Sequence, residues 1–218
     1  MSRVNVWTAA ALSLAMTAGT AVLPPAPAAR AQVFKIGETG FPSVIRVAIR
    51  ENNPFGEADP RGRILYVKTV NFDQYCRDVL PNEWYPSWRP ASLAAGAIAV
   101  KMFGWYHHLH PVMVGGFTFD VDNTVNFQTY LEQSEQDATD RAYYATRHLA
   151  YVPPTQEIQE LNYRAGYANN PNWQYRNAQK IAQWGTEYWA ALGRTPLQIL
   201  QFYYMNRDLT VIPGVGKG

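Results

Sequence analysis

The sequence predicts an α+β fold: a single compact domain in which a central Ala-rich helix packs with other helices and with mixed or antiparallel strands. Strand-like and helix-like segments follow one another without the strand–helix–strand rhythm of a parallel α/β sheet. One long segment, 92–108, is rich in Ala and Gly, which let a neighbouring element approach closely. No repeat, low-complexity tract or linker divides the chain, so we expect one domain over residues 32–213.

The first elements follow from apolar alternation and capping residues. Two strands are expected at 43–50 and 62–70, joined by a loop of Asn, Pro and Gly. A short helix capped by Asn71 or Asp73 should follow, and Pro81 is expected to end it.

Apolar residues at three- and four-residue spacing predict the central helix over 92–108. After it, a Gly-Gly turn leads into FTFDVDNTVNFQTY, which favours a strand and then a functional loop. The remaining segments are expected, in order, as a helix, a strand and two helices: 134–148 with Ser134 as its cap, 157–163, 178–192, and Pro196 to Met205.

The first 31 residues are typical of a signal peptide. Arg3 provides a basic start, 7–23 is mostly apolar, and Ala29-Arg30-Ala31 offers a cleavage site. The apolar stretch is too short and interrupted for a stable membrane span. We therefore expect an exported protein, secreted or in the cell envelope, with no membrane span in its mature form.

Charge and cysteine content exclude some functions. Without Arg3 and Arg30 the chain has equal numbers of basic and acidic residues, which argues against a nucleic-acid binder. Cys76 is the only cysteine, so no intrachain disulfide can form, and we interpret it as a small buried hydrophobe. Residues 214–218 are expected to be a disordered tail.

Glu83 lies in a turn of proline and aromatic residues just before the central helix. A carboxylate among Trp84, Tyr85 and Trp88 would lose solvation, and this raises its pKa toward the range of a general acid. Aromatic faces also stack on the apolar faces of sugar rings. The simpler alternative is a glutamate that only caps or decorates the helix entry.

Four blocks in order resemble the SpoIID/LytB family of stage II sporulation protein D-like domains. They are Val44-Ile45-Arg46-Val47, the segment from Tyr75 to His107 with LPNEWYPSW, the segment DVDNTVNFQTY from Asp120 to Tyr130, and the segment from Ile181 to Tyr204. The resemblance implies a lytic transglycosylase that acts on peptidoglycan glycan strands, with Glu83 at the position of the family's catalytic acid. Other cell-wall enzymes are possible further partners.

The resemblance and the closeness to Glu83 together give a set of expected substrate-binding residues: Trp84, Trp88, Lys101, Asp120, Asp122, Thr124, Gln128, Tyr163 and Gln183. For Asp120, Thr124 and Gln128, simple turn chemistry is an equal alternative, because Asp and Asn stabilise turns on their own. Tyr163 and Gln183, like the neighbouring Trp184 and Tyr188, could equally be packing residues.

Several family positions carry other residues here. The Lys and Gln of the helix after the acid fall on Ala94 and Gly96, and its Arg falls on Lys101. A Cys, His and Cys set that looks like a zinc site falls on Asp122, Asn126 and Phe127, which is a poor zinc set. We therefore expect no metal and no cofactor.

Two other functions stay open. A non-catalytic glycan-binding module, or a modifier of another cell-wall enzyme, would suit the replaced positions. A metal-dependent hydrolase would use His107, His108 and His110, although adjacent helical histidines point in different directions and suit a helix end equally well. Glu132 and Glu135 are interpreted as a solvated surface pair.

Overall fold

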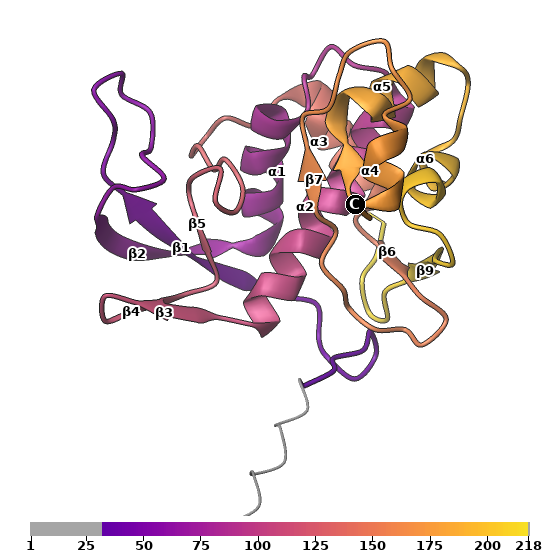
Figure 1. Ribbon diagram of the computed structural model, residues 1–218. Helices are drawn as coiled ribbons and strands as arrows, with labels where there is room; N and C mark the ends of the chain where they lie inside the picture. Colours follow the sequence, from indigo (N-terminus) through magenta and orange to yellow (C-terminus); the bar gives the residue numbers. More distant parts are fainter. Residues whose placement is uncertain (1–31, 218) are drawn as a thin grey trace, which may run out of the picture. The chain divides into compact units, whose positions relative to one another are not determined.

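The computed structural model describes residues 32–217 (Figure 1). The segment Val33–Gly218 forms one compact unit, while the other unit, Met1–Gln32, falls outside the described residues except for Gln32. The predicted signal peptide therefore lies outside them. Within the described part, six helices combine with several small sheets, so the predicted α+β class is confirmed.

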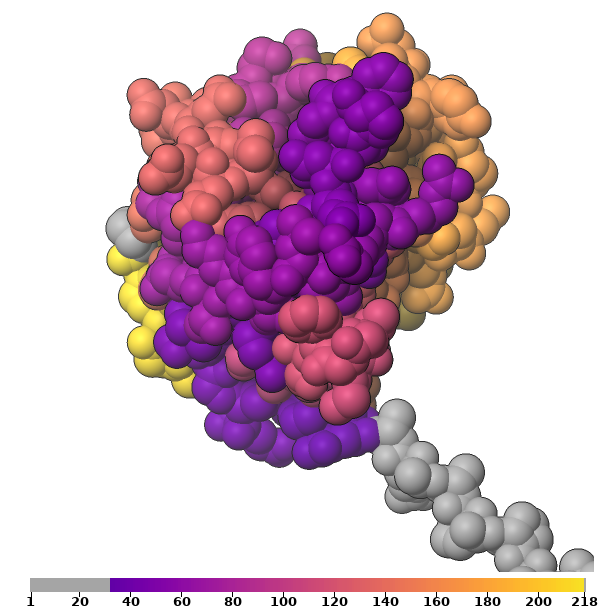
Figure 2. Space-filling model, turned by 90° about the vertical axis from the view of Figure 1, so that its left-hand side faces the viewer, coloured from indigo at the N-terminus to yellow at the C-terminus, as the bar shows by residue number. Residues whose placement is uncertain are grey.

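The main sheet has three strands in the order β2-β1-β5. β1 (Val44–Arg50) and β2 (Ile64–Asn71) are antiparallel, with Val44 opposite Asn71, and both follow the predicted strands closely. β5 (Val121–Asp122) pairs in parallel with the other edge of β1. Figure 2 shows this side of the molecule, with the early strands (indigo to purple) across the middle of the surface.

Three two-stranded pairs complete the β structure: β3 (Val112–Val114) with β4 (Phe117–Phe119), β6 (Leu149–Val152) with β9 (Asp208–Val211), and β7 (Tyr163–Arg164) with β8 (Ile181–Ala182). The sequence did not predict β6 or β9. Each has only four residues, and their pairing joins segments distant in the chain. The expected strand at 157–163 is reduced to β7.

The central helix α2 (Pro90–Leu109) is buried almost all round, from Ser92 to Trp105. Figure 1 shows the other helices around it, and four of them contact it: α1 (Phe72–Glu83), α3 (Asp137–Thr146), α5 (Gln183–Ala191) and α6 (Pro196–Tyr203). The small residues of α2 allow this, because large side chains of α1 and of Trp84, directly after it, cover its glycines. The predicted central position of this helix is confirmed.

Helix α1 continues past Pro81, so the expected stop at this proline is wrong. Asn71 caps the start, accepting a hydrogen bond from the Gln74 amide at 3.1 Å. In the turn that the proline disturbs, the Asp78 carbonyl accepts hydrogen bonds from Asn82 Nδ2 (2.6 Å) and from a serine hydroxyl of a later loop. Side chains thus support the last turn, and the helix reaches Glu83.

The other helix bounds differ from expectation by a turn or less, except at α5. Helix α3 begins at Asp137, because the side chain of Ser134 bonds to carbonyls instead of capping the helix. A short helix, α4 (Trp173–Asn177), precedes β8 and α5, which together occupy the predicted 178–192 helix. Gly193, with φ of +76°, follows α5 as the expected terminator.

The C-terminal segment packs partly on the core, where Val215 contacts buried residues. None of the helices in the described part of the chain is both long and apolar enough to cross a membrane.

Candidate active site

Glu83 is the last residue of α1 and is only partly exposed. Its Oε1 accepts a hydrogen bond from the Thr129 backbone amide at 2.7 Å, and its Oε2 accepts one from Gln183 Nε2 at 3.0 Å. The same Gln183 nitrogen donates to the Glu83 carbonyl at 2.6 Å. Two distant segments of the chain therefore hold this one carboxyl group.

Burial raises the pKa of the Glu83 carboxyl above its ordinary value, because loss of solvation disfavours the charged form. The hydrogen bonds from Thr129 and Gln183 and the positive charge of Arg164 stabilise the carboxylate and offset part of this rise. The net effect favours the protonated acid, which is the form that a general acid needs before it reacts.

Glu83 opens into a cavity of about 290 Å³. Tyr85, Trp88 and Trp184 form one wall, with ring centroids 5.3 Å apart for Tyr85–Trp88, 5.6 Å for Tyr85–Trp184 and 4.8 Å for Trp88–Trp184. We call these three residues the aromatic wall. The other lining residues are small or polar: Pro81, Asn82, Val125, Thr129, Ala165 and Gln183. Among the described residues that line the cavity, Glu83 is the only carboxylic acid.

Trp84, which we expected on the cavity wall, is fully buried behind it. Its indole Nε1 donates to Thr186 Oγ1 at 3.0 Å, and its ring meets Tyr163 edge-on at 4.9 Å between centroids. The side chain enters the core because Gly96 of α2 leaves room for it. Trp84 therefore supports the turn and does not face the cavity.

Gln128 and Tyr163 are also buried rather than facing the cavity. Gln128 Oε1 accepts from the Tyr75 hydroxyl at 2.7 Å, and its Nε2 donates to the Tyr163 hydroxyl at 2.9 Å. This network holds the residue next to Thr129, whose amide binds Glu83. These side chains act on the site through the position of that loop.

Asp120, Asp122 and Thr124 lie at the sheet, away from the cavity. Asp120 is paired with Arg46 and Asp122 with Arg50, and Asp122 Oδ1 accepts from the Thr124 amide and hydroxyl at 3.0 and 2.7 Å. Only the bonds between Asp122 and Thr124 are the turn chemistry that we considered as the alternative, because the pairs with Arg46 and Arg50 join distant segments. From this loop, Val125 and Thr129 line the cavity instead.

Lys101 is fully buried in α2 and does not reach the cavity. Its Nζ donates to the carbonyls of Thr146 and Arg147, at 2.6 and 3.0 Å, where α3 ends. Loss of solvation lowers the pKa of its amine to about 7. The expected substrate contact is thus a helix-end contact in this structure.

Ala94, at another replaced family position, lies in an apolar groove of about 640 Å³ between α2 and α3. Trp88 lines this groove as well as the Glu83 cavity, so the two hollows share one wall.

The residues at the family's zinc positions do not fit a zinc ion. Asp122 is held by Arg50 at 2.7 Å, and the Phe127 ring packs against His107 at 5.0 Å between centroids. In the described part of the chain, no cluster of three or more His, Cys, Asp and Glu could hold a metal.

The three histidines turn in separate directions. His107 Nε2 lies 2.8 Å from Glu160, His108 Nδ1 lies 3.1 Å from Asp120, and His110 Nδ1 lies 2.8 Å from the Tyr106 carbonyl. Each has its own partner, so they do not converge on a common ligand.

Sequence reasoning missed the Thr129 amide, since a backbone N–H leaves no signature in the residue type. It also missed Asn82 and Val125 as lining residues. Tyr85 and Trp184 had been noticed only as aromatic neighbours or packing candidates, and the structure brings both to the cavity wall.

Comparisons with known proteins agree with the resemblance described above. Residues 60–152 match the SpoIID family model, stage II sporulation protein. A protein of Brachyspira hyodysenteriae that is described as uncharacterized is 34% identical over 86 residues, which is 37% of this chain and 23% of that protein. The chain thus spans about a quarter of the length of the curated relative it matches.

The family match begins in the loop before β2 and ends in β6, so the first and fourth blocks of the sequence resemblance lie outside it. The resemblance to the SpoIID family is confirmed over residues 60–152, the segment that supplies Glu83, Trp88 and Thr129 to the cavity.

Proposed function

We propose that this protein cleaves peptidoglycan glycan strands as a lytic transglycosylase, with Glu83 as its general acid and base. The SpoIID match supports a cell-wall-related role. The specific reaction is supported by one observation above all: a desolvated glutamate in an aromatic-walled cavity that has no second carboxylic acid among its described lining residues.

A single acid suits this reaction because the substrate provides its own nucleophile. A hydrolase needs a second carboxylate to activate water or to attack the sugar. In the lytic reaction, the C6 hydroxyl of the N-acetylmuramic acid ring attacks C1 of the same ring. The C1–O bond to the next sugar breaks, and the electron pair leaves with that oxygen.

Glu83 would transfer the two protons of this reaction in turn. Its carboxyl first gives a proton to the leaving glycosidic oxygen, which becomes a free 4-hydroxyl group. The resulting carboxylate then takes the proton of the C6 hydroxyl as the new C6–O–C1 bond closes. The products are a 1,6-anhydromuramic end and a strand that begins with N-acetylglucosamine, and Glu83 is protonated again.

The surroundings of Glu83 support both roles. Hydrogen bonds from the Thr129 amide and Gln183 hold the carboxyl group in one orientation, while burial keeps it protonated at a higher pH than a solvated glutamate. The aromatic wall offers ring faces on which a sugar can stack.

A non-catalytic glycan-binding module is the second candidate. It is favoured by the replaced family positions, because Ala94 and Gly96 carry no polar side chain and Lys101 is buried away from the cavity. In this case the aromatic wall would bind glycan and Glu83 would only accept hydrogen bonds. Such a module would act by changing the activity of another cell-wall enzyme.

The test is incubation with purified glycan strands, with and without stem peptides, and mass spectrometry of the fragments. Anhydromuramic ends with the wild type, and none with Glu83→Gln, support catalysis. A Glu38→Gln variant, at an exposed and distant site, is the matched control. No anhydromuramic ends at any pH, or equal cleavage by Glu83→Gln, would contradict it.

Glycan binding is measured separately, by titration calorimetry. Trp184→Ala should weaken binding by about 2 kcal/mol, roughly 30-fold, as expected for an aromatic anchor. Trp173→Ala, an exposed tryptophan that does not line the cavity, should not weaken it. Binding that survives Glu83→Ala without any cleavage identifies the binding module.

The proposed substrate lies outside the cytoplasm, so we also propose export to the cell envelope through the segment 1–31. Fractionation of cells that express the tagged protein tests this, and retention in the cytoplasm would argue against it.

A further inference from the structure

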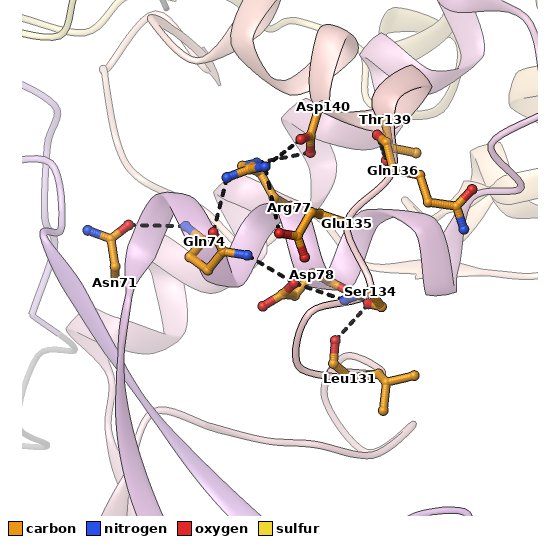
Figure 3. A network of polar contacts seen from close by, with 10 residues as sticks. All are labelled: Asn71, Gln74, Arg77, Asp78, Leu131, Ser134, Glu135, Gln136, Thr139 and Asp140. Atoms are coloured by element: carbon orange, nitrogen blue, oxygen red, sulfur yellow. Dashed lines mark hydrogen bonds and ion pairs between the residues drawn. The ribbon is translucent and has the colours of Figure 1, made fainter.

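Two buried carboxylate oxygens near the Glu83 cavity have no hydrogen-bond donor. Asp78 is fully buried in α1, and its Oδ2 has no partner; Oε2 of Glu135, from the loop before α3, is buried and unpartnered as well. Figure 3 shows the two carboxyl groups next to each other, and each shifts the pKa of the other. The Glu135 side chain as a whole is 31% exposed, so only this oxygen departs from the solvated surface that we expected.

The other oxygen of Asp78 is well supplied with donors. Asp78 Oδ1 accepts from Gln74 Nε2 at 3.1 Å and from the Ser134 amide at 3.2 Å (Figure 3). Figure 3 also shows Arg77 above the pair, where it bonds Asp140 and lies 3.9 Å from Glu135. A buried, donor-rich Oδ1 beside an Oδ2 that faces another carboxyl group is the arrangement expected when Oδ2 carries a proton and donates it to Glu135.

We propose that Asp78 and Glu135 share one proton, and that this carboxyl–carboxylate hydrogen bond fastens the loop 129–136 to α1 as a positioning device for the Glu83 site. Asp78 is the donor in this pair and Glu135 the acceptor. Without the proton, two negative charges would face each other in a buried contact. The loop would then lose its attachment to α1.

The link to Glu83 follows from the connectivity. Helix α1 holds the loop at two points: Glu83 binds the Thr129 amide, and Asp78 binds Ser134 and Glu135. Between them, Asn82 Nδ2 donates to Ser134 Oγ at 2.8 Å and also lines the cavity. The catalytic consequence rests on the proposed function, whereas the shared proton and the loop attachment do not.

The groups facing the pair explain where its proton lies. Burial and the neighbouring Glu135 raise the pKa of Asp78 to about 6, and hydrogen bonds, with Arg77 nearby, lower the pKa of Glu135. Tyr130 on the loop interacts with both carboxyl groups and has Glu132 and Tyr66 as further neighbours, and Asp140 on α3 binds the same Arg77. The loop should therefore be fastened in acid and released as the pH rises through about 6.

The proton can be observed directly. Carbon-13 NMR of labelled Asp and Glu carboxyl groups is expected to find one protonated carboxyl in the pair near pH 5, where an ordinary aspartate is ionised. The Ser134 amide, which donates to Asp78 Oδ1, should shift in the same titration. Asp78→Asn should remove both changes, because its amide donates to Glu135 at every pH and keeps Oδ1 for Ser134 and Gln74.

Stability gives a second readout. From the ordinary aspartate pKa up to about 6, the wild type should lose up to about tenfold in its folding equilibrium constant for each pH unit, relative to Asp78→Asn. Glu135→Gln should behave like Asp78→Asn. Glu132→Gln, on the same loop but exposed and paired with Lys68, should keep the pH dependence of the wild type.

Three results would overturn the inference: both carboxyl groups ionised near pH 5, an unchanged pH dependence in Asp78→Asn, or a titration that changes on adding a chelator, which would place a cation between them.

Glycan cleavage is followed in parallel. If the wild type never cleaves, the proposed function fails while the NMR and stability results still decide on the shared proton. If it cleaves, Asp78→Asn should change the pH profile.

Discussion

The indole of Trp84 lies directly on Gly96. A methyl group built on Gly96 would meet three indole atoms at 2.6, 2.7 and 2.8 Å, closer than real side-chain contacts. Gly96 is also the position on which a glutamine falls in the family that the sequence resembles. The large residue and the missing side chain therefore belong together, and they anchor the turn after Glu83 to the central helix.

Replacing Gly96 with Ala should destabilise the protein, although alanine favours a helix. The new methyl group cannot be accommodated without moving a fully buried ring, and overpacking of this kind costs about 1–3 kcal/mol. Chemical denaturation measures the change. A second replacement, Trp84→Met, should recover part of the loss in the double variant, because it removes the ring that meets the methyl group.

The control for this prediction is Gly40→Ala, where the added methyl group meets nothing within 4 Å. It should leave stability nearly unchanged. If Gly96→Ala were as stable as the wild type, the close contact between Trp84 and Gly96 would not exist in solution.

The main elements and the acid could be predicted because their signals are local. The alternation in β1 and β2, the small residues of α2 and the glutamate among aromatic residues all lie within single segments. The small residues also indicated the close packing now seen between Gly96 and Trp84.

The direction of each aromatic ring could not be predicted. Trp84 and Trp88 are four residues apart, yet one enters the core and the other lines the cavity, because only Trp84 faces a glycine of α2. The partners of Asp78 and Lys101 come from loops and helix ends far along the chain. Such contacts depend on tertiary structure, which residue types alone do not specify.

The buried Lys101 should make stability depend on pH in a defined window. Its folded pKa of about 7 lies below its ordinary value of 10.5, so the unfolded chain binds more protons between these values. The free energy of unfolding should therefore rise with pH above 7, by at most about 1.4 kcal/mol per pH unit. The stability should be measured up to about pH 8.5 only. Above the ordinary thiol pKa, the buried Cys76 makes stability fall with pH, because its own pKa is raised in the folded protein.

Lys101→Met should abolish this rise, since no group remains to titrate there. At pH 8.5 it should also be less stable than the wild type by about 1–3 kcal/mol, because the Thr146 and Arg147 carbonyls lose their donor. Lys68→Met, at a more exposed lysine, is the control and should keep the rise. The same slope in wild type and Lys101→Met would mean that Lys101 is not buried as described.

The pH profile of cleavage should depend on Gln183. Glu83 must be protonated to act as an acid, so kcat/KM should fall as the pH rises through its pKa. The Gln183 amide stabilises the carboxylate and lowers that pKa. Gln183→Met keeps the volume but removes the donor, so the falling limb should move to higher pH. Gln201→Met, on the exposed side of α6, should leave it in place. Carbon-13 NMR of the Glu83 carboxyl gives the same shift without any substrate. Two results would mean that a group other than Glu83 donates the proton. The falling limb of kcat/KM could move to lower pH in Gln183→Met, or it could stay in place while the Glu83 pKa measured by NMR rises.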